Sequence, residues 1–439
     1  MTAVRAPRLP EGAIRARARE GVAAIFPAVG EYGHALFGAA PATGPVPDEL
    51  DRTRIVPPVF VPGRLERMFE LGREPLYGDV DLRCRIGGFA APLPVFLCAF
   101  GSTQAATGSG LGVAAAEQAG RLGIPMVIGE NIVPMHGYGR EDEATAPKDG
   151  MLERIRTYAA AAPAGLGGVV VQQSTEDADA EVWNLVYSDP VATRLLEEGR
   201  LAFELKVGQG AKPGLGGMTV LSRECAEAVS DLYSVDEAFG RGAARVLRSS
   251  SPGTFTEEIL RRQIHLMRNN YPRARTWVKL HPGRDVAQAA ELAWSAGADA
   301  VTVDGAEGGT GWAPSVFLDQ VGLPLAECLR RIGAHDAALL ASGRIWEGGR
   351  ALKCLALGAT AAGLGRAALL AVDEDGAEGL VRLVRCLELE LRLLLSALGR
   401  YRIGELAPDD LWLPEGGPSQ SPNASPSPSP NQAFEEAWR

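Results

Sequence analysis

The sequence predicts an α/β fold, a TIM (β/α)8 barrel, on the strength of three observations. The chain has 439 residues, 46% hydrophobic and 22% charged, which suits one large domain with appendages better than several small ones. From about residue 59, short apolar runs alternate with helical segments, as a parallel β/α fold requires. Eight such runs can be counted, and eight parallel strands close a barrel.

The predicted strands follow one another along the chain. They cover residues 95–99, 126–129, 168–172, 202–207, 276–280, 300–304, 338–341 and 361–363. Helix signals follow several of them: Ser102 can cap a helix over 104–122, and helices are expected over 286–296 and 350–357. Residues 219–275 are too many for one helical crossover, and we expect them to form additional structure at the mouth of the barrel.

Two segments are expected to lie outside the barrel. The predicted divisions are a helical extension over 1–56, the barrel over 57–411 and a disordered tail over 412–439. Residues 11–26 have helical spacing, and Glu11 and Glu20 argue against a transit peptide there. Residues 416–432 are rich in proline and serine and cannot bury a core.

Composition argues against several kinds of protein. A formal net charge of −10 argues against a partner that is nucleic acid or an anionic membrane, and no apolar run is long enough for a membrane span. The six cysteines form no CxxC pair, so we expect reduced thiols and a cytoplasmic location. The five histidines form no cluster, and no metal site is predicted.

The most informative stretch is residues 203–218, FELKVGQGAKPGLGGM. An alternating apolar strand runs into five glycines and a proline, which let the backbone approach a bound molecule closely. Lys206 and Lys212 add positive charge beside that loop. The alternative is a surface loop with solvated lysines.

KVGQGAKPGLGG resembles the signature loop of the FMN-binding synthase domain of glutamate synthase. A second stretch, VDGAEGGTGWAP at 303–314, is similar to another motif of that family, with Glu307 where aspartate is usual. The resemblance covers roughly residues 57–411. It implies a flavoprotein oxidoreductase of amino acid metabolism that binds FMN in a TIM barrel.

The resemblance also implies residues that contact the flavin. Lys279, at the end of the fifth strand, would stabilise the negative charge of reduced FMN; the alternative is a lysine that extends to solvent from a strand end. Ser102, in the turn after the first strand, is also an implied flavin contact; its alternative role is to cap the helix that follows. The remaining implied contacts come from Ala99, Gln173, Gly308, Gly309 and Thr310.

In phosphate-binding barrels the loops after strands seven and eight hold the phosphate. Both loops of this chain contain glycine and arginine, which supply backbone donors and a cation for a dianion. The implied phosphate residues are Ser342, Gly343, Arg344, Gly365 and Arg366.

The implied substrate is a small carboxylate. Its binding candidates are Lys212, Arg248, Gln209 and Glu130. Met218 replaces a family glutamine and Leu215 a glutamate, which favours an acid more apolar than 2-oxoglutarate, or an amino acid. Lys206 or Lys212 is the candidate proton donor or acceptor. The alternative for Lys212 and Arg248 is two unrelated surface charges.

The chain also departs from the family. The cysteines that would hold a 3Fe–4S cluster after strand eight are missing and Cys386 stands alone, so no iron–sulfur cluster is predicted. No cysteine precedes Cys84, so no glutaminase nucleophile is expected. Without a cluster, electrons would pass to or from a small molecule, a separate protein or oxygen. The chain could also form a homo-oligomer.

The predicted reaction is hydride transfer between flavin N5 and the carbon that bears the amine, imine or hydroxyl of the substrate. Two alternatives stay open. One is a non-redox FMN isomerase of the type 2 isopentenyl diphosphate isomerase kind, and the other is a flavin-binding subunit without catalysis.

Overall fold

The structure is a computed structural model that describes most of the chain. The described residues are 4–28, 47–100, 110–129, 150–174, 180–210, 219–227, 230, 234–249, 255–310 and 313–414.

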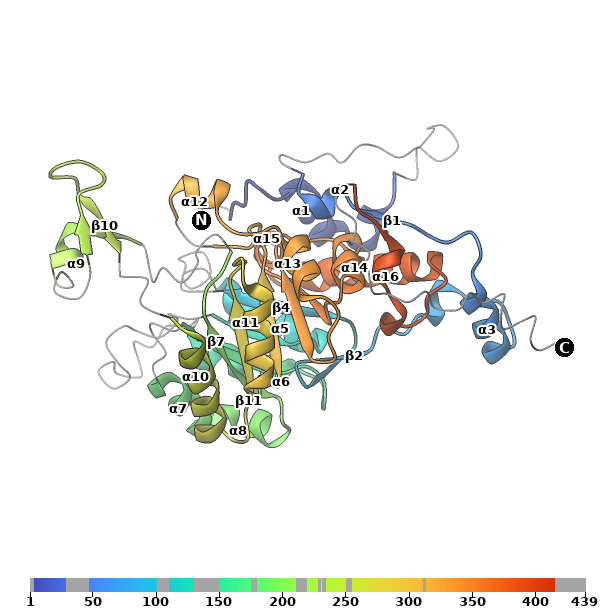
Figure 1. The fold of residues 1–439 in the computed structure, drawn as a ribbon, viewed down its shortest axis with the longest axis horizontal. Coiled ribbons are helices and arrows are strands. Elements are labelled where there is room, and N and C mark those ends of the chain that lie inside the picture. The colour runs from blue at the N-terminus through green and yellow to red at the C-terminus, as the bar shows by residue number, and fades with distance from the viewer. Residues whose placement is uncertain are drawn as a thin grey trace.

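Eight parallel strands close into a barrel, so the predicted TIM barrel is confirmed (Figure 1). In barrel order the strands are β11 (Arg275–Leu280), β12 (Ala300–Asp304), β13 (Ala338–Ser342), β14 (Ala361–Leu364), β4 (Val95–Phe100), β5 (Met126–Ile128), β6 (Val169–Ser174) and β7 (Leu201–Lys206). All eight predicted strands are found, each within two residues of its expected ends.

The strands are apolar on both faces because helices cover the outside of the barrel and side chains fill the inside. The alternation is clear in β6, where Val169 and Val171 pack in the outer core while Val170 packs in the interior. The helices around the barrel include α5 (Leu111–Leu122), α6 (Met151–Ala161), α7 (Ala180–Ser188), α8 (Pro190–Glu197), α10 (Glu257–Asn270), α11 (Val286–Ser295), α13 (Leu325–Ile332), α14 (Gly348–Ala356), α15 (Arg366–Glu374) and α16 (Gly379–Ala397). Within the described ranges, no helix combines the length and apolarity that crossing a membrane requires.

A hairpin packs against one end of the barrel interior. Strands β2 (Cys84–Ile86) and β3 (Phe89–Ala91) precede the first barrel strand, and Phe89 packs against Trp277 with ring centroids 5.5 Å apart. The indole nitrogen of Trp277 donates to the carbonyl oxygen of Gly87 at 3.1 Å. Gly87 has a φ of 52°, and a Cβ there would lie 2.4 Å from the Trp277 ring, so this turn requires glycine.

The long segment after β7 does not form a single crossover, in line with its length. Its described residues make a small antiparallel sheet of β8 (Thr219–Ser222), β10 (Arg245–Ser249) and β9 (Ser234–Asp236), together with α9 (Arg223–Glu227). Figure 1 shows this sheet apart from the barrel, at the left of the view.

The N-terminal residues pack on the helices that follow the last strands. Helix α1 (Glu11–Glu20) lies against α15 and α16, and Arg17 pairs with Glu390 at 2.6 Å. The short helix α2 (Glu49–Arg52) begins with a capping box formed by Asp48 and Asp51. Strand β1 (Arg54–Ile55) then pairs with β15 (Leu411–Trp412), near the end of the described chain.

The carboxylates of Asp48 and Asp51 also bind two arginines of the barrel. Arg350, which has no exposed surface, reaches Asp48 at 2.7 Å and Asp51 at 2.6 Å. Arg344 reaches the same carboxylates at 3.1 and 2.5 Å. Four charges therefore attach the N-terminal segment to the loop and helix after β13.

Replacing Arg350 with alanine should lower the free energy of unfolding by up to about 3–5 kcal/mol, because the partly buried carboxylates of Asp48 and Asp51 lose one of their two arginine partners. Urea unfolding followed by circular dichroism measures the change. The matched control is Arg385→Ala, since Arg385 pairs with Glu388 on the surface. That variant should change stability by less than about 1 kcal/mol. Equal unfolding midpoints for Arg350→Ala and wild type would contradict the assignment.

Candidate active site

The carboxyl ends of the barrel strands place charged side chains inside the barrel. Glu204 and Lys206 follow the interior residue Ala202 at intervals of two along β7, and Lys279 follows Trp277 in the same way on β11. Glu204 is 1% exposed, Lys279 7% and Asp304, on β12, 2%. Charged residues are this deeply buried only when they are paired, so the contacts of these side chains define the site.

The centre of the site is a buried ion pair between Lys279 and Asp304. The Lys279 Nζ lies 3.1 Å from Asp304 Oδ2. The hydroxyl of Ser342, at the end of β13, donates a hydrogen bond to the other oxygen of Asp304. The backbone nitrogen of Gly210 donates to Asp304 Oδ2 at 3.2 Å. One carboxylate thus connects three neighbouring strand ends and the loop after β7.

The surroundings keep Lys279 in its cationic form. Burial alone would lower the pKa of Lys279, but the nearby groups of Asp304, Cys98 and Glu204 outweigh it and raise the pKa above its ordinary value. The thiol of Cys98 is buried, which raises its pKa to about 12 and leaves it neutral at physiological pH. Lys279 is therefore a fixed positive charge at the mouth of the barrel.

Glu204 lies deeper in the barrel, in a second layer of polar side chains. The hydroxyl of Thr302 donates to Glu204 Oε1 at 2.9 Å, and the amide of Gln172 donates to Oε2. Burial raises the pKa of Glu204, while Lys279 and the two hydrogen bonds oppose that rise. This layer separates the charged mouth from the apolar interior around Trp277.

Lys206 lies directly beside Lys279, because the two residues are partners in the register of β7 and β11. Its Nζ donates to Gln209 Oε1 at 3.2 Å. One of the two lysines predicted to transfer a proton, Lys206, thus lies adjacent to the fixed cation and contacts Gln209, a predicted substrate residue.

The glycine-rich loop after β12 packs against the loop after β7. Gly210 has a φ of 38°, and a Cβ there would lie 3.0 Å from the carbonyl oxygen of Gly308. Thr310 follows in the same loop, and its buried hydroxyl oxygen has no hydrogen-bond partner among the residues that the structure describes. A buried hydroxyl left unpaired is costly, and it marks a position where a ligand atom can complete the hydrogen bond.

Arg366 is the first residue of α15, immediately after β14 and Gly365. Its Nη2 donates to the carbonyl oxygen of Glu307 at 2.5 Å, which joins the loops after β12 and β14. Burial lowers the pKa of Arg366 to about 10, so the guanidinium remains charged at neutral pH. The first turn of α15 therefore combines a cation with the positive end of a helix, as an anion site requires.

Arg344 occupies a different environment from Arg366. It has a φ of 57° and follows Gly343, whose φ is 154°. Its guanidinium contacts the carboxylates of Asp48 and Asp51. The structure thus places this predicted phosphate residue in the ion-pair network of the N-terminal segment, and its role toward a phosphate stays a prediction.

The other predicted residues divide into three groups. Ala99 and Ser342 lie at the interior; in the loop after β12, Gly308 lies beside Asp304 and Gly309 beside Arg366. Arg248 lies on β10, in the small sheet that Figure 1 draws apart from the barrel. Ser102, Glu130 and Lys212 lie outside the described residues.

Gln173 is placed on the outer side of the barrel. It pairs in register with Leu205, which packs in the outer core, whereas Gln172 pairs with Glu204 and faces the interior. A cofactor contact at Gln173 stays a prediction, and the residue that faces the interior is Gln172; a continuous run such as VVVQQ does not show which residues point inward.

Sequence reasoning also missed Asp304 and Glu204 as members of the site. The usable signal was their even spacing from interior residues, four from Ala300 to Asp304 and two from Ala202 to Glu204, on strands already predicted correctly. Among the residues that the structure describes, no group of three or more His, Cys, Asp or Glu side chains could hold a metal ion.

Glu307 gives the mouth a pH-dependent stability. Its Oε2 accepts a hydrogen bond from the backbone nitrogen of Leu325 at 3.0 Å. Burial, with a contribution from Asp48, raises the pKa of Glu307 from its ordinary 4.5 to about 7. A carboxyl whose pKa is higher in the folded chain than in the unfolded chain binds its proton more tightly when the chain is folded. Its contribution to the free energy of unfolding is therefore complete below the unfolded pKa and is lost as the pH rises through 7.

The urea midpoint of the wild type should therefore fall relative to that of Glu307→Gln as the pH rises from about 5 to about 8. Glutamine cannot titrate, so the difference between the two proteins isolates Glu307. The control is Glu70→Gln, because Glu70 is exposed and pairs with Arg67 on the surface. Parallel profiles for Glu307→Gln and wild type would show that Glu307 does not titrate in this range.

Comparison with known proteins agrees with the resemblance of the loops. Residues 160–376 match a family model described as the conserved region in glutamate synthase. The archaeal-type glutamate synthase [NADPH] of Dehalococcoides mccartyi is 30% identical over 256 residues, which cover 50% of each chain. A glutamate synthase large subunit-like protein of Rhizobium meliloti is 35% identical over 184 residues, 40% of each chain. The chain thus spans half or less of the length of these relatives.

Solved structures share the fold at low identity. A soluble mutant of the membrane-associated (S)-mandelate dehydrogenase from Pseudomonas putida has a TM-score of 0.51 and 19% identity, over 92% of this chain and 99% of that one. The flavin-binding domain of baker's yeast flavocytochrome b2 has a TM-score of 0.52 and 20% identity, over 89% and 82%. Residues 160–376 therefore carry the conserved region of glutamate synthase, and the chain is a distant homologue of the archaeal-type glutamate synthases.

Proposed function

We propose that the chain is an FMN-dependent oxidoreductase that acts on a small amino, imino or hydroxy carboxylate. The observation that carries the proposal is the buried cation of Lys279, held by Asp304 at the mouth of the barrel. Two further features support it: the unpaired hydroxyl of Thr310 and the arginine at the first turn of α15. The membership of residues 160–376 in the conserved region of glutamate synthase supports the same reaction class.

The phosphate of FMN is assigned to the loop before α15. Gly365 leaves room there, since a Cβ at this position would meet its nearest neighbour, Cys98 Cβ, only at 3.8 Å. Arg366 supplies a cation that can bind phosphate through two nitrogens, and the helix N-terminus supplies backbone donors. Arg344 already binds two carboxylates, so Arg366 is the principal cation for this phosphate.

The flavin ring is assigned to the space above Lys279 and beside the glycine-rich loop after β12. FMN, when bound, accepts a hydride from the substrate carbon. Lys279 provides positive charge where the ring gains electrons, and its position is fixed before binding because Asp304 holds it. Thr310 would complete its hydrogen bonding with a polar atom of the cofactor.

The substrate is assigned to the same mouth, beside Lys206 and Gln209. Oxidation of an amine or hydroxyl removes a hydride from carbon and a proton from nitrogen or oxygen. Lys206 or Lys212 is the group that exchanges this proton, and a cationic side chain beside it can orient the carboxylate. Arg248, on the small sheet apart from the barrel, would have to approach the mouth to take part. A separate protein or a small molecule completes the electron transfer, since Cys386 is the only cysteine after the last barrel strand.

Arg366→Ala should weaken FMN binding by about 10- to 100-fold, the effect of losing a charge-assisted hydrogen bond to phosphate. Quenching of flavin fluorescence in a titration of the apoprotein measures the affinity. Riboflavin serves as the matched ligand because it lacks the phosphate. Its affinity should be equal in the wild type and the variant, and an equal loss for both ligands would place the phosphate elsewhere.

Lys279→Met should slow substrate-dependent bleaching of the FMN absorbance by about 100-fold or more, because the cation that stabilises the developing charge is lost. The assay mixes FMN-loaded protein anaerobically with a panel of 2-amino and 2-hydroxy acids and follows the absorbance. The control is Arg385→Met, which removes an exposed cation that pairs with Glu388 on the surface. If no acid of the panel bleaches the wild type, the proposed oxidation of such acids is wrong.

A further inference from the structure

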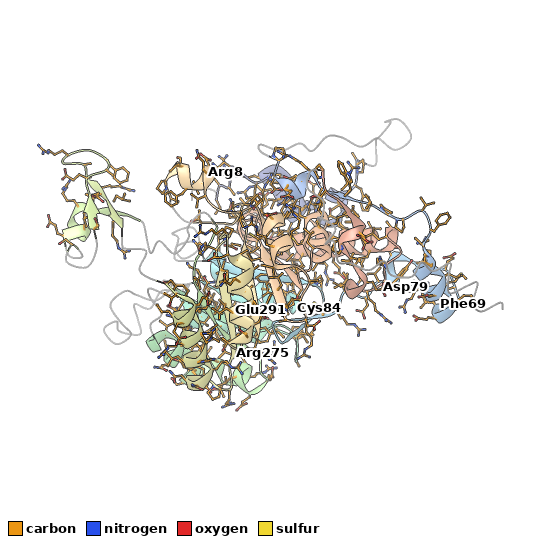
Figure 2. The ribbon with its side chains drawn as sticks, in the orientation of Figure 1. Arg8, Phe69, Asp79, Cys84, Arg275 and Glu291 are labelled. Atoms are coloured by element: carbon orange, nitrogen blue, oxygen red, sulfur yellow. The ribbon has the colours of Figure 1, made fainter. Side chains whose placement is uncertain are left out.

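A surface far from the mouth carries an unusual number of exposed apolar side chains. Helix α3 (Pro62–Leu71) projects from the molecule at the right of Figure 1, and none of its residues is buried. Phe60 is 86% exposed and Phe69 74% exposed; Figure 2 shows Phe69 at the outer edge of the molecule. We define the α3 patch as Val59, Phe60, Leu65, Phe69, Leu76 and Tyr77, all exposed apolar side chains. A cluster of this kind marks an interaction site more often than a bare surface.

A cavity of about 370 Å³ lies beside the patch. Leu76 and Tyr77 line one side, and Leu393 and Ala397 of α16 line the other. Arg64 is the charged residue at its wall, and its Nε donates to the hydroxyl of Tyr401 at 3.1 Å. The cavity is large enough for one aromatic side chain, and it offers a cation to an acidic neighbour.

The end of the described chain lies near this patch. Trp412 and Leu411 of β15 pair with Arg54 and Ile55 of β1. Phe60 follows Arg54 by six residues, so the two are at most about 20 Å apart. The chain therefore leaves the described structure at Pro414 within reach of the α3 patch.

The sequence beyond Pro414 has the composition of a tether followed by a binding segment. Residues 415–432 number eighteen and are rich in proline and serine, and in an extended form they span up to about 56 Å. Residues 433–439, AFEEAWR, again contain aromatic side chains. Phe434 and Trp438 are four apart, so one turn of helix would place both on one side.

We propose that residues 433–439 of the same chain dock on the α3 patch, with Trp438 in the cavity. Two observations favour this occupant over a second copy of the chain or a separate protein. The tether is attached close to the patch, which gives the segment an effective concentration in the millimolar range. The segment also pairs aromatic residues with Glu435 and Glu436, which complement the apolar cavity and Arg64.

The experiment compares the full chain with a chain that ends at Pro414. A labelled peptide of residues 433–439 is titrated with each, and fluorescence anisotropy reports binding. The shortened chain should bind the peptide at least about tenfold more tightly than the full chain, because its own segment no longer occupies the patch. In the shortened chain, Phe69→Ser should abolish binding. The matched control is Phe26→Ser, which changes another exposed phenylalanine and should leave binding unchanged.

Three results would overturn the proposal. The peptide could bind neither protein, or bind both equally, which would show that the segment does not occupy the patch. Alternatively, light scattering could show a dimer of the full chain that persists after shortening and is lost with Phe69→Ser. That result would assign the patch to an interface between copies.

In the full chain, Trp438→Ala should by itself restore peptide binding, which tests the cavity contact without a deletion.

Discussion

The buried ion pair between Lys279 and Asp304 is the interaction on which the mouth of the barrel depends. Two charges removed from water are held only if their remaining hydrogen-bonding capacity is filled, and here Ser342 and Gly210 fill the capacity of the carboxylate. Because these partners come from β13 and from the loop after β7, the pair also sets the relative positions of the loops around the site. This one ion pair therefore fixes the position of the Lys279 cation and also orders the loops at the mouth of the barrel.

The same pair explains why the barrel interior is divided into layers. Below it, Glu204 is satisfied by Gln172 and Thr302, and further down Trp277 closes an apolar core against Phe89. Burial of charge is unfavourable unless it is compensated, so polar residues are confined to the end where loops can supply partners. This arrangement agrees with the general rule that TIM barrels have catalytic residues at the carboxyl ends of the strands and residues important for stability at the opposite end.

The sequence predicts the strands well because each is a short apolar run bounded by turns, and Lys279 is predicted correctly as an inward residue at a strand end. It does not predict which of Gln172 and Gln173 faces inward, since β6 is apolar on both sides. Nor does it predict the partners of Arg344, because Asp48 and Asp51 lie almost 300 residues earlier. Local patterns determine elements, whereas pairings of distant charges depend on how the elements pack.

The N-terminal segment therefore belongs to the site more closely than its place in the sequence suggests. Asp48 and Asp51 bind Arg344 and Arg350, and Asp48 also contributes to the raised pKa of Glu307. Without these carboxylates, the full charge of Arg344 would add to that of Arg366, whose pKa it already lowers. The carboxylates balance the charge of Arg344, whereas Arg366 lies at the start of α15 and hydrogen-bonds a backbone carbonyl oxygen. An extension packed outside a barrel can in this way set the charge of the loops that its ligand must enter.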